Sequence, residues 1–222
     1  MSYHFKPETA RPGVAESLGN LFVADGGRSH PYIASHIFAR GRETGRDLAD
    51  AVHFISSLHG RNPGVMELTR DKPAEGGVRG WVDAAAQGFI EERAYLNRIV
   101  VAAGPLPSTP GQAECEAAVI GQRHAIEMLA RSERNGCALG AAVALVLDWR
   151  PIRAVLDAAA QRFGVTLIPP AMPSARQTIA IAEEVQSPAV ERAIVFGAQQ
   201  LLVQHRGLWD LLETRASARI GT

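Results

Sequence analysis

The sequence predicts an all-α protein, built as a single-domain bundle of about eight helices. Apolar residues recur at helical spacing along most of the chain, whereas an alternating strand pattern is absent apart from residues 165–168, which would have no partner strand. Residues 137–147 form an unbroken run of apolar residues and glycine. A helix that is apolar on every side is buried in a bundle or in lipid, and this run is shorter than the ~20 residues that cross a bilayer. We therefore expect 137–147 to form a buried central helix.

The composition is that of a soluble globular protein. A chain of 222 residues suits one domain with an arm, and 46% hydrophobic residues suffice for a real core. Lys+Arg and Asp+Glu balance at 23 each, which favours neither nucleic acid nor an anionic membrane as a partner. The two cysteines form no C-x-x-C unit, and the N-terminus lacks the apolar core of a signal peptide. We expect a cytoplasmic protein with reduced thiols.

The N-terminal half is expected to begin with an arm. Residues 1–28 mix proline, glycine and charge around a short apolar piece, and residues 29–222 form the helical bundle domain. Ser29 is expected to cap the first bundle helix, which ends near Gly41. After a second helix, residues 60–80 are broken by prolines and glycines and are expected to form a long loop with a flexible glycine hinge at 76–80. The sequence pattern does not determine whether this loop acts as a lid.

The C-terminal half carries clearer start signals. Thr109, followed by Pro110 and by Gln112, is expected to cap a helix that continues to about residue 133. Asp148, with Pro151 three residues on, indicates a break after the apolar run and a new helix to about Phe163. The remaining expected helices begin near residues 47 and 81, at a capping box formed by Ser174 and Gln177, and at Pro188.

Four polar side chains fall at inward-facing positions of the predicted helices: His59, Glu92, Gln122 and His205. A carboxylate buried without a partner costs several kcal/mol, so these groups must meet a donor, a cation or a ligand. One interpretation is a satisfied polar network that fixes the register of the helices. The alternatives are a polar ligand pocket, which would also include His124, and a metal site.

No metal or catalytic motif is present. Carboxylate-bridged di-metal bundles use Glu-x-x-His pairs, and the nearest patterns are Asp50-x-x-His53 and the reversed His124-x-x-Glu127. The reversed order does not direct the two side chains at the same point, because helical side chains lean towards the N-terminus. The chain has no nucleophile motif of the Gly-x-Ser-x-Gly kind and no phosphate loop. We predict no metal site, and neither the catalytic residues nor the cofactor follow from the sequence.

Five glycines lie inside predicted helices: Gly88, Gly121, Gly140, Gly197 and Gly207. Each costs about 1 kcal/mol relative to alanine, so some interaction should offset it. Close packing between helices would do so. The alternatives are a flat ligand that lies against a helix where glycine leaves space, or a dimer face formed through Gly121 or Gly197.

Residues 121–130 (GQRHAIEMLA), the run 137–150 and residues 197–209 (GAQQLLVQHRGLW) resemble an uncharacterised helical family of proteobacteria. The resemblance covers most of the chain after about residue 30 and implies no activity. In architecture the chain is similar to ferritin-like and haem-oxygenase-like bundles, but a fold does not by itself give a function.

The sequence is compatible with two functions. The first is a bundle of unassigned activity that associates with itself, as a homodimer, or binds a partner. The alternative is a small-molecule or cofactor-binding enzyme with a polar pocket around Glu92, Gln122, His124 and His205. The sequence does not decide whether the protein is an enzyme.

Overall fold

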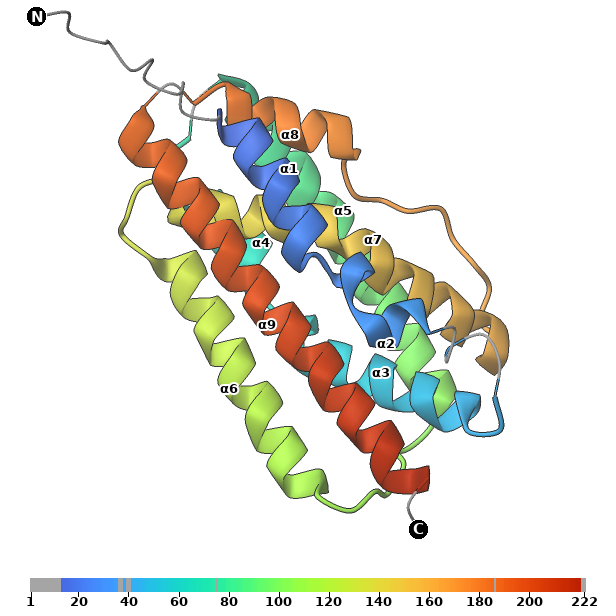
Figure 1. The fold of residues 1–222 in the computed structure, drawn as a ribbon. Helices are drawn as coiled ribbons and strands as arrows, with labels where there is room; N and C mark the ends of the chain where they lie inside the picture. Colours follow the sequence, from blue (N-terminus) through green and yellow to red (C-terminus); the bar gives the residue numbers. More distant parts are fainter. Residues whose placement is uncertain (1–12, 36–37, 39–40, 75, 186, 221–222) are drawn as a thin grey trace, which may run out of the picture.

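The fold is all-α, as predicted. The computed structural model describes residues 13–35, 38, 41–74, 76–185 and 187–220. These residues form nine α-helices and one 3-10 turn, and no strand occurs among them (Figure 1). The elements are α1 (Val14–Asp25), η1 (Gly27–Ser29), α2 (Pro31–Ala34), α3 (Thr44–His59), α4 (Val65–Arg70), α5 (Gly76–Ala103), α6 (Gln112–Arg131), α7 (Cys137–Phe163), α8 (Ala175–Glu183) and α9 (Pro188–Ile220).

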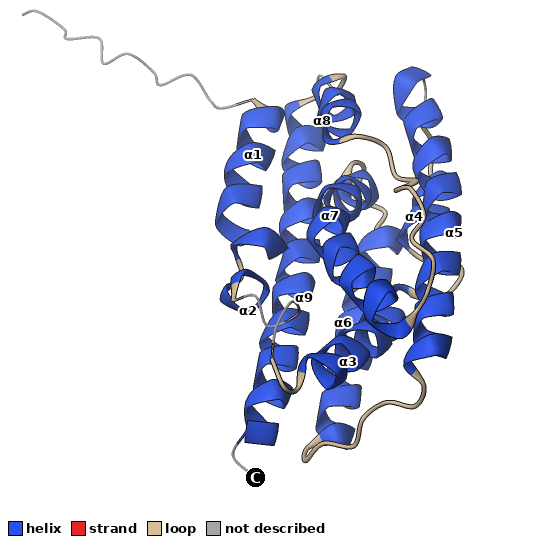
Figure 2. Ribbon diagram, turned by 90° about the vertical axis from the view of Figure 1, so that its right-hand side faces the viewer, coloured by secondary structure: helices blue, strands red, loops and turns tan. Residues whose placement is uncertain are grey.

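The apolar run 137–147 is the buried centre, which confirms the prediction. It forms the first half of α7, and all its residues are buried except Leu139 and Leu147, which are half-buried. Figure 2 shows α7 surrounded by other helices, and it contacts α3, α4, α5, α6, α8 and α9. Within the described residues, no helix combines the length and the hydropathy that a membrane crossing requires.

The predicted break at Asp148 is wrong, because α7 continues from Cys137 to Phe163 with Pro151 inside it. Proline removes one backbone hydrogen bond, here to the carbonyl of Leu147, at a cost of roughly 3 kcal/mol. Burial of the residues beyond it offsets this cost, since Ile152 and Leu156 are fully buried. The side chain of Asp148 caps no helix and is instead buried in a hydrogen-bond network.

Three local features of the first 80 residues differ from what the sequence pattern indicates. Part of the expected arm is the helix α1, whose Leu18 is fully buried and which packs against α8 and α9. His30, not Ser29, caps the single turn α2, because its Nδ1 accepts from the backbone N–H of Tyr32 at 3.2 Å. The glycine hinge expected at residues 76–80 is the first turn of α5.

The two predicted capping boxes have different outcomes. Gly111, in the left-handed conformation, is the N-cap of α6, and no side chain caps this helix. Thr109 is buried and accepts a hydrogen bond from Arg219, so a tertiary contact replaces the expected cap. At α8 the box of Ser174 and Gln177 forms as predicted.

Three of the helical glycines allow the helix backbone to touch the backbone of another segment. A Cβ at Gly140 would lie 2.0 Å from the carbonyl oxygen of Ile194 on α9, and one at Gly197 would lie 2.1 Å from that of Cys137 on α7. Gly88 similarly faces the carbonyl of Ala171 at 2.3 Å. Gly197 is therefore inside the molecule, and the expectation that it forms a dimer face is wrong. A Cβ at Gly121 would meet nothing within 4 Å.

Alanine at Gly140 or Gly197 is expected to destabilise the protein, because the methyl group meets rigid backbone and overpacking costs ~1–3 kcal/mol or more. Gly121→Ala is the matched control, since it adds the same group to a helix in open space and should gain up to ~1 kcal/mol. Urea unfolding of the three variants measures the difference. Equal effects at Gly140 and Gly121 would contradict the close packing.

Candidate functional site

The structure brings two of the five predicted site residues into direct contact. His59, at the end of α3, and His205, in the middle of α9, face each other with 2.9 Å between their Nε2 atoms. Both are buried. The other nitrogen of His205, Nδ1, lies 2.7 Å from Oδ2 of Asp148 on α7, and the remaining Asp148 oxygen accepts from the backbone N–H of Gly27 at 2.7 Å. We call Asp148, His205 and His59 the Asp-His-His chain.

The hydrogen bonds of the Asp-His-His chain fix the tautomers when both rings are neutral. A carboxylate only accepts, so Nδ1 of His205 carries the proton that points to Asp148. Nε2 of His205 then has a lone pair and accepts from the N–H at Nε2 of His59. The nitrogen of His59 that stays unprotonated is Nδ1, and no described residue donates a hydrogen bond to it.

His59 is held neutral by its surroundings. Burial lowers its pKa well below the usual 6.5, and the charges of His205 and Arg93 act in the same direction. The ring packs edge-on against Phe89 and Trp149, with ring centroids 6.3 and 5.8 Å apart. The burial of the ring thus disfavours its charged form, and the neutral ring is the stable form.

Glu92 belongs to a neighbouring cluster in which its carboxylate is fully satisfied. It accepts from Arg153 at 2.7 and 2.9 Å, from Nε1 of Trp149 at 3.0 Å and from the backbone N–H of Ala171 at 2.9 Å. These bonds join α5, α7 and the connector before α8. Trp149 also packs against His59, so Glu92 lies one side chain away from the Asp-His-His chain.

Gln122 and His124 lie outside this network. Gln122 is half-buried on α6, where its amide faces Gly207 of α9, and its Oε1 is buried without a partner among the described residues. His124 is exposed. No hydrogen bond joins either residue to the Asp-His-His chain within the described part of the protein. A ligand-binding role for these two residues stays a prediction.

Asp148 is the site residue that the sequence reasoning missed. An aspartate at the end of an apolar run, with a proline three residues later, has the local pattern of a helix start. The signal that favours burial is the apolar periodicity on both sides of Asp148, which continues from the run 137–147 into Ile152 and Leu156.

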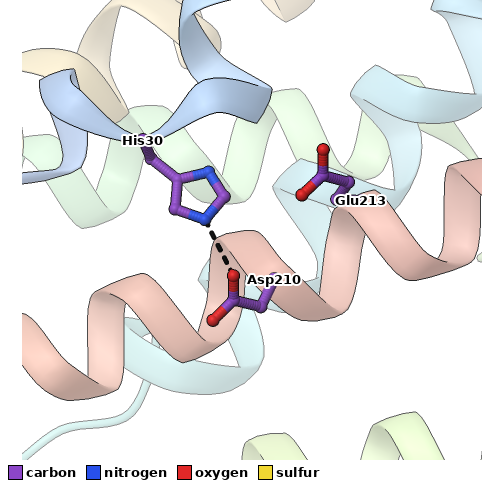
Figure 3. A group of neighbouring side chains, drawn as sticks. All are labelled: His30, Asp210 and Glu213. Atoms are coloured by element: carbon purple, nitrogen blue, oxygen red, sulfur yellow. Dashed lines mark hydrogen bonds and ion pairs between the residues drawn. The ribbon is translucent and has the colours of Figure 1, made fainter.

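A second histidine cluster joins α2 to α9. His30, Asp210 and Glu213 place ligand-type atoms within 4.8 Å of one another, and Figure 3 shows His30 directed at Asp210. Nε2 of His30 lies 3.0 Å from Oδ1 of Asp210. Because Nδ1 accepts from the backbone N–H of Tyr32, Nε2 of the neutral ring carries the proton and has no lone pair for a metal ion. The cluster fits a hydrogen-bonded helix cap.

A large cleft opens beside Asp148, with a volume of about 1080 Å³. It lies between one face of α7 and the segments α1, η1, α2, α3 and α8. Its walls are mostly apolar and include Leu18, Phe22, Ile33, Phe38, Leu48, Pro151, Ala154, Val155, Ala158 and Ile179. Asp148 forms part of its lining, together with Arg28, Arg150 and Arg162. The Asp-His-His chain therefore begins at the cleft and leads into the core.

The chain belongs to a family of unknown function, DUF6975, whose model matches residues 22–220. No curated protein matches the sequence, and no solved structure matches it either. The resemblance to an uncharacterised helical family is thereby confirmed.

His59 is expected to make stability depend on pH. Unfolded His59 binds a proton near pH 6.5, whereas the folded residue does so only at much lower pH. Below pH 6.5 the unfolded state thus binds more protons, and the unfolding free energy falls by up to about 1.4 kcal/mol per pH unit.

Urea unfolding at pH 7.5 and pH 5.5 tests this expectation. His59→Gln removes this titration while leaving an amide to hydrogen-bond His205, so the loss of stability on acidification should be smaller in the variant. The same loss in wild type and variant would show that His59 is not held neutral.

Proposed function

We propose that this member of the family binds a small molecule in the cleft beside α7. The observation that carries the proposal is the cleft itself, about 1080 Å³ in volume with walls that are mostly apolar. Ligand sites in proteins are concave, predominantly apolar and of roughly 300–1,000 Å³, with a few polar groups that orient the ligand. The volume of the cleft lies just above the upper end of this range, and its polar groups are few in number.

The cleft exists because α7 presents a proline and two alanines on the face that lines it. Pro151, Ala154 and Ala158 follow one another at spacings of three and four, so they share one side of the helix. Large apolar residues, Phe22 of α1 and Phe38, line the cleft as well and do not fill it. Apolar surface that stays in contact with water is unfavourable, and an apolar ligand would remove it from water.

This proposal keeps the small-molecule site that the sequence predicted but places it in a different part of the protein. The pocket was expected around Glu92, Gln122, His124 and His205, whereas the cleft reaches this group only through Asp148 and its hydrogen bond to His205. We assign no reaction to the site. A cytoplasmic location, expected from the cysteines, stays a prediction.

Filling the cleft tests the proposal. Ala154→Phe places a large ring on an exposed position of α7 that lines the cleft, and Ala94→Phe makes the same change on an exposed position of α5 that lines none of the cavities described. Nile red, a neutral apolar dye, should gain fluorescence with wild type and Ala94→Phe and bind Ala154→Phe at least about tenfold more weakly. Far-UV circular dichroism confirms the fold of each variant. Equal dye binding by all three proteins would contradict the proposal.

Self-association remains a second candidate, and one surface favours it. Four large apolar residues are exposed on α6 and α9, which lie side by side in Figure 1: Ile120, Met128, Phe196 and Val203. Gly121, next to Ile120, has open space around it. Exposed apolar residues that gather on neighbouring elements are typical of protein interfaces.

A homodimer through this surface predicts a change of mass. In Ile120→Lys combined with Met128→Lys, two charges would have to be buried at the interface, so the protein should become monomeric. Val101→Lys is the control, since Val101 is an exposed apolar residue on α5. Sedimentation equilibrium of the three proteins measures the mass. A monomeric wild-type protein would rule out this candidate.

A further inference from the structure

We infer that the ligand of the cleft is an amphipathic anion, in which an apolar chain carries a carboxylate or phosphate group that Arg28 and Arg150 bind. This inference rests on the proposed small-molecule function of the cleft. It adds the chemical class of the ligand and its orientation.

The arginines of the cleft differ from those in the core. Arg93, Arg153 and Arg215 are buried, and each is paired with a carboxylate. Arg28, Arg150 and Arg162 line the cleft, and none of them forms a hydrogen bond or ion pair with another described residue. Three arginines thus line a mostly apolar cleft without the carboxylate partners that the buried arginines have.

Asp148 does not supply the missing partner. It is the one acidic residue among the described residues that line the cleft, and only 2% of its surface is exposed. Both of its oxygens are occupied, one by the backbone N–H of Gly27 at 2.7 Å and the other by Nδ1 of His205 at 2.7 Å. The charged groups that remain open to a ligand are therefore all positive.

Two of the three arginines lie at the same end of the cleft. Arg28 follows Gly27, whose N–H binds Asp148, and Arg150 is two residues beyond Asp148 on α7. Arg162 lies twelve residues further along the helix, which corresponds to about 18 Å, and its guanidinium approaches Gly45 of α3. The cleft is thus elongated, with a pair of arginines at one end and a single arginine at the other.

The surface between these ends is apolar. Pro151, Ala154 and Ala158 line the cleft along α7 from Arg150 towards Arg162. An elongated ligand would place its charged group between Arg28 and Arg150, and its apolar chain would lie along these small residues. Guanidinium groups bind carboxylate and phosphate oxygens in pairs of parallel hydrogen bonds, so either head group satisfies the arginines.

Isothermal titration calorimetry with three ligands of equal chain length tests the inference. Decanoate and decyl phosphate carry the two head groups, and decan-1-ol has the same chain without charge. Wild type should bind at least one of the anions about tenfold more tightly than the alcohol, a difference of about 1.4 kcal/mol. The tighter of the two anions identifies the head group.

Two variants locate the head group. Arg28→Gln combined with Arg150→Gln should remove the preference for the anion and leave binding of decan-1-ol unchanged. Arg162→Gln removes a charge from the other end of the same cleft and should change anion binding less than about threefold. All three arginines are exposed, so the variants are expected to fold, and circular dichroism checks this.

The outcomes separate the inference from the proposal on which it rests. Equal binding of the alcohol and both anions would overturn the anionic class while leaving a ligand-binding cleft. An equal loss in Arg162→Gln and in the double variant would overturn the orientation. If neither the three ligands nor Nile red binds, the proposed function fails together with the inference.

Discussion

The contact between the backbones of α7 and α9 is the constraint on which the rest of the structure depends. Gly140 and Gly197 each lie against a carbonyl of the opposite helix, so the backbones of α7 and α9 meet at these positions without a side chain between them. This approach sets the position of α9 relative to α7 beyond the glycines. Asp148 lies two turns after Gly140, and His205 lies about two turns after Gly197, and these two residues share a hydrogen bond. The polar network at the cleft is thus positioned by a glycine contact several residues away.

Buried charges add a second layer of constraint. Glu67, Glu92 and Asp50 are each paired with a buried arginine, and these pairs connect α4 with α5, α5 with α7, and α3 with α9. Breaking such a pair costs ~3–5 kcal/mol because it leaves a charge without a partner in the core. A helix that slid or turned in the bundle would break these pairs. We therefore expect these pairs to favour the observed register of the helices over shifted ones.

The parts of the fold that depend on local pattern could be predicted from the sequence. The unbroken apolar run required burial, and the inward positions of α9 from Ile194 to Leu212, including His205, are buried as their spacing indicated. The box of Ser174 and Gln177 formed because both partners lie within one turn. The polar residues His59 and Glu92 were correctly placed in the core, since a polar group at a helical inward position is visible in one sequence.

The parts that depend on contacts between distant segments could not be predicted. The cleft is formed by five helices, and α1 is one of its walls. The sequence of α1 is short and contains glycine, so its local pattern indicated an arm and not a helix. Asp148 has the local pattern of a cap, and only the positions of Gly27 and His205 show that it is a buried acceptor. Tertiary contacts overrode local propensity here, as they did at Thr109.

Pro151 has a mechanical consequence for the cleft. The helical turn that contains it lacks the hydrogen bond to the carbonyl of Leu147, and both residues line the cleft. A helix bends most easily where one of its backbone bonds is missing. A change in the curvature of α7 at this turn would shift the residues that line the cleft on either side of Pro151.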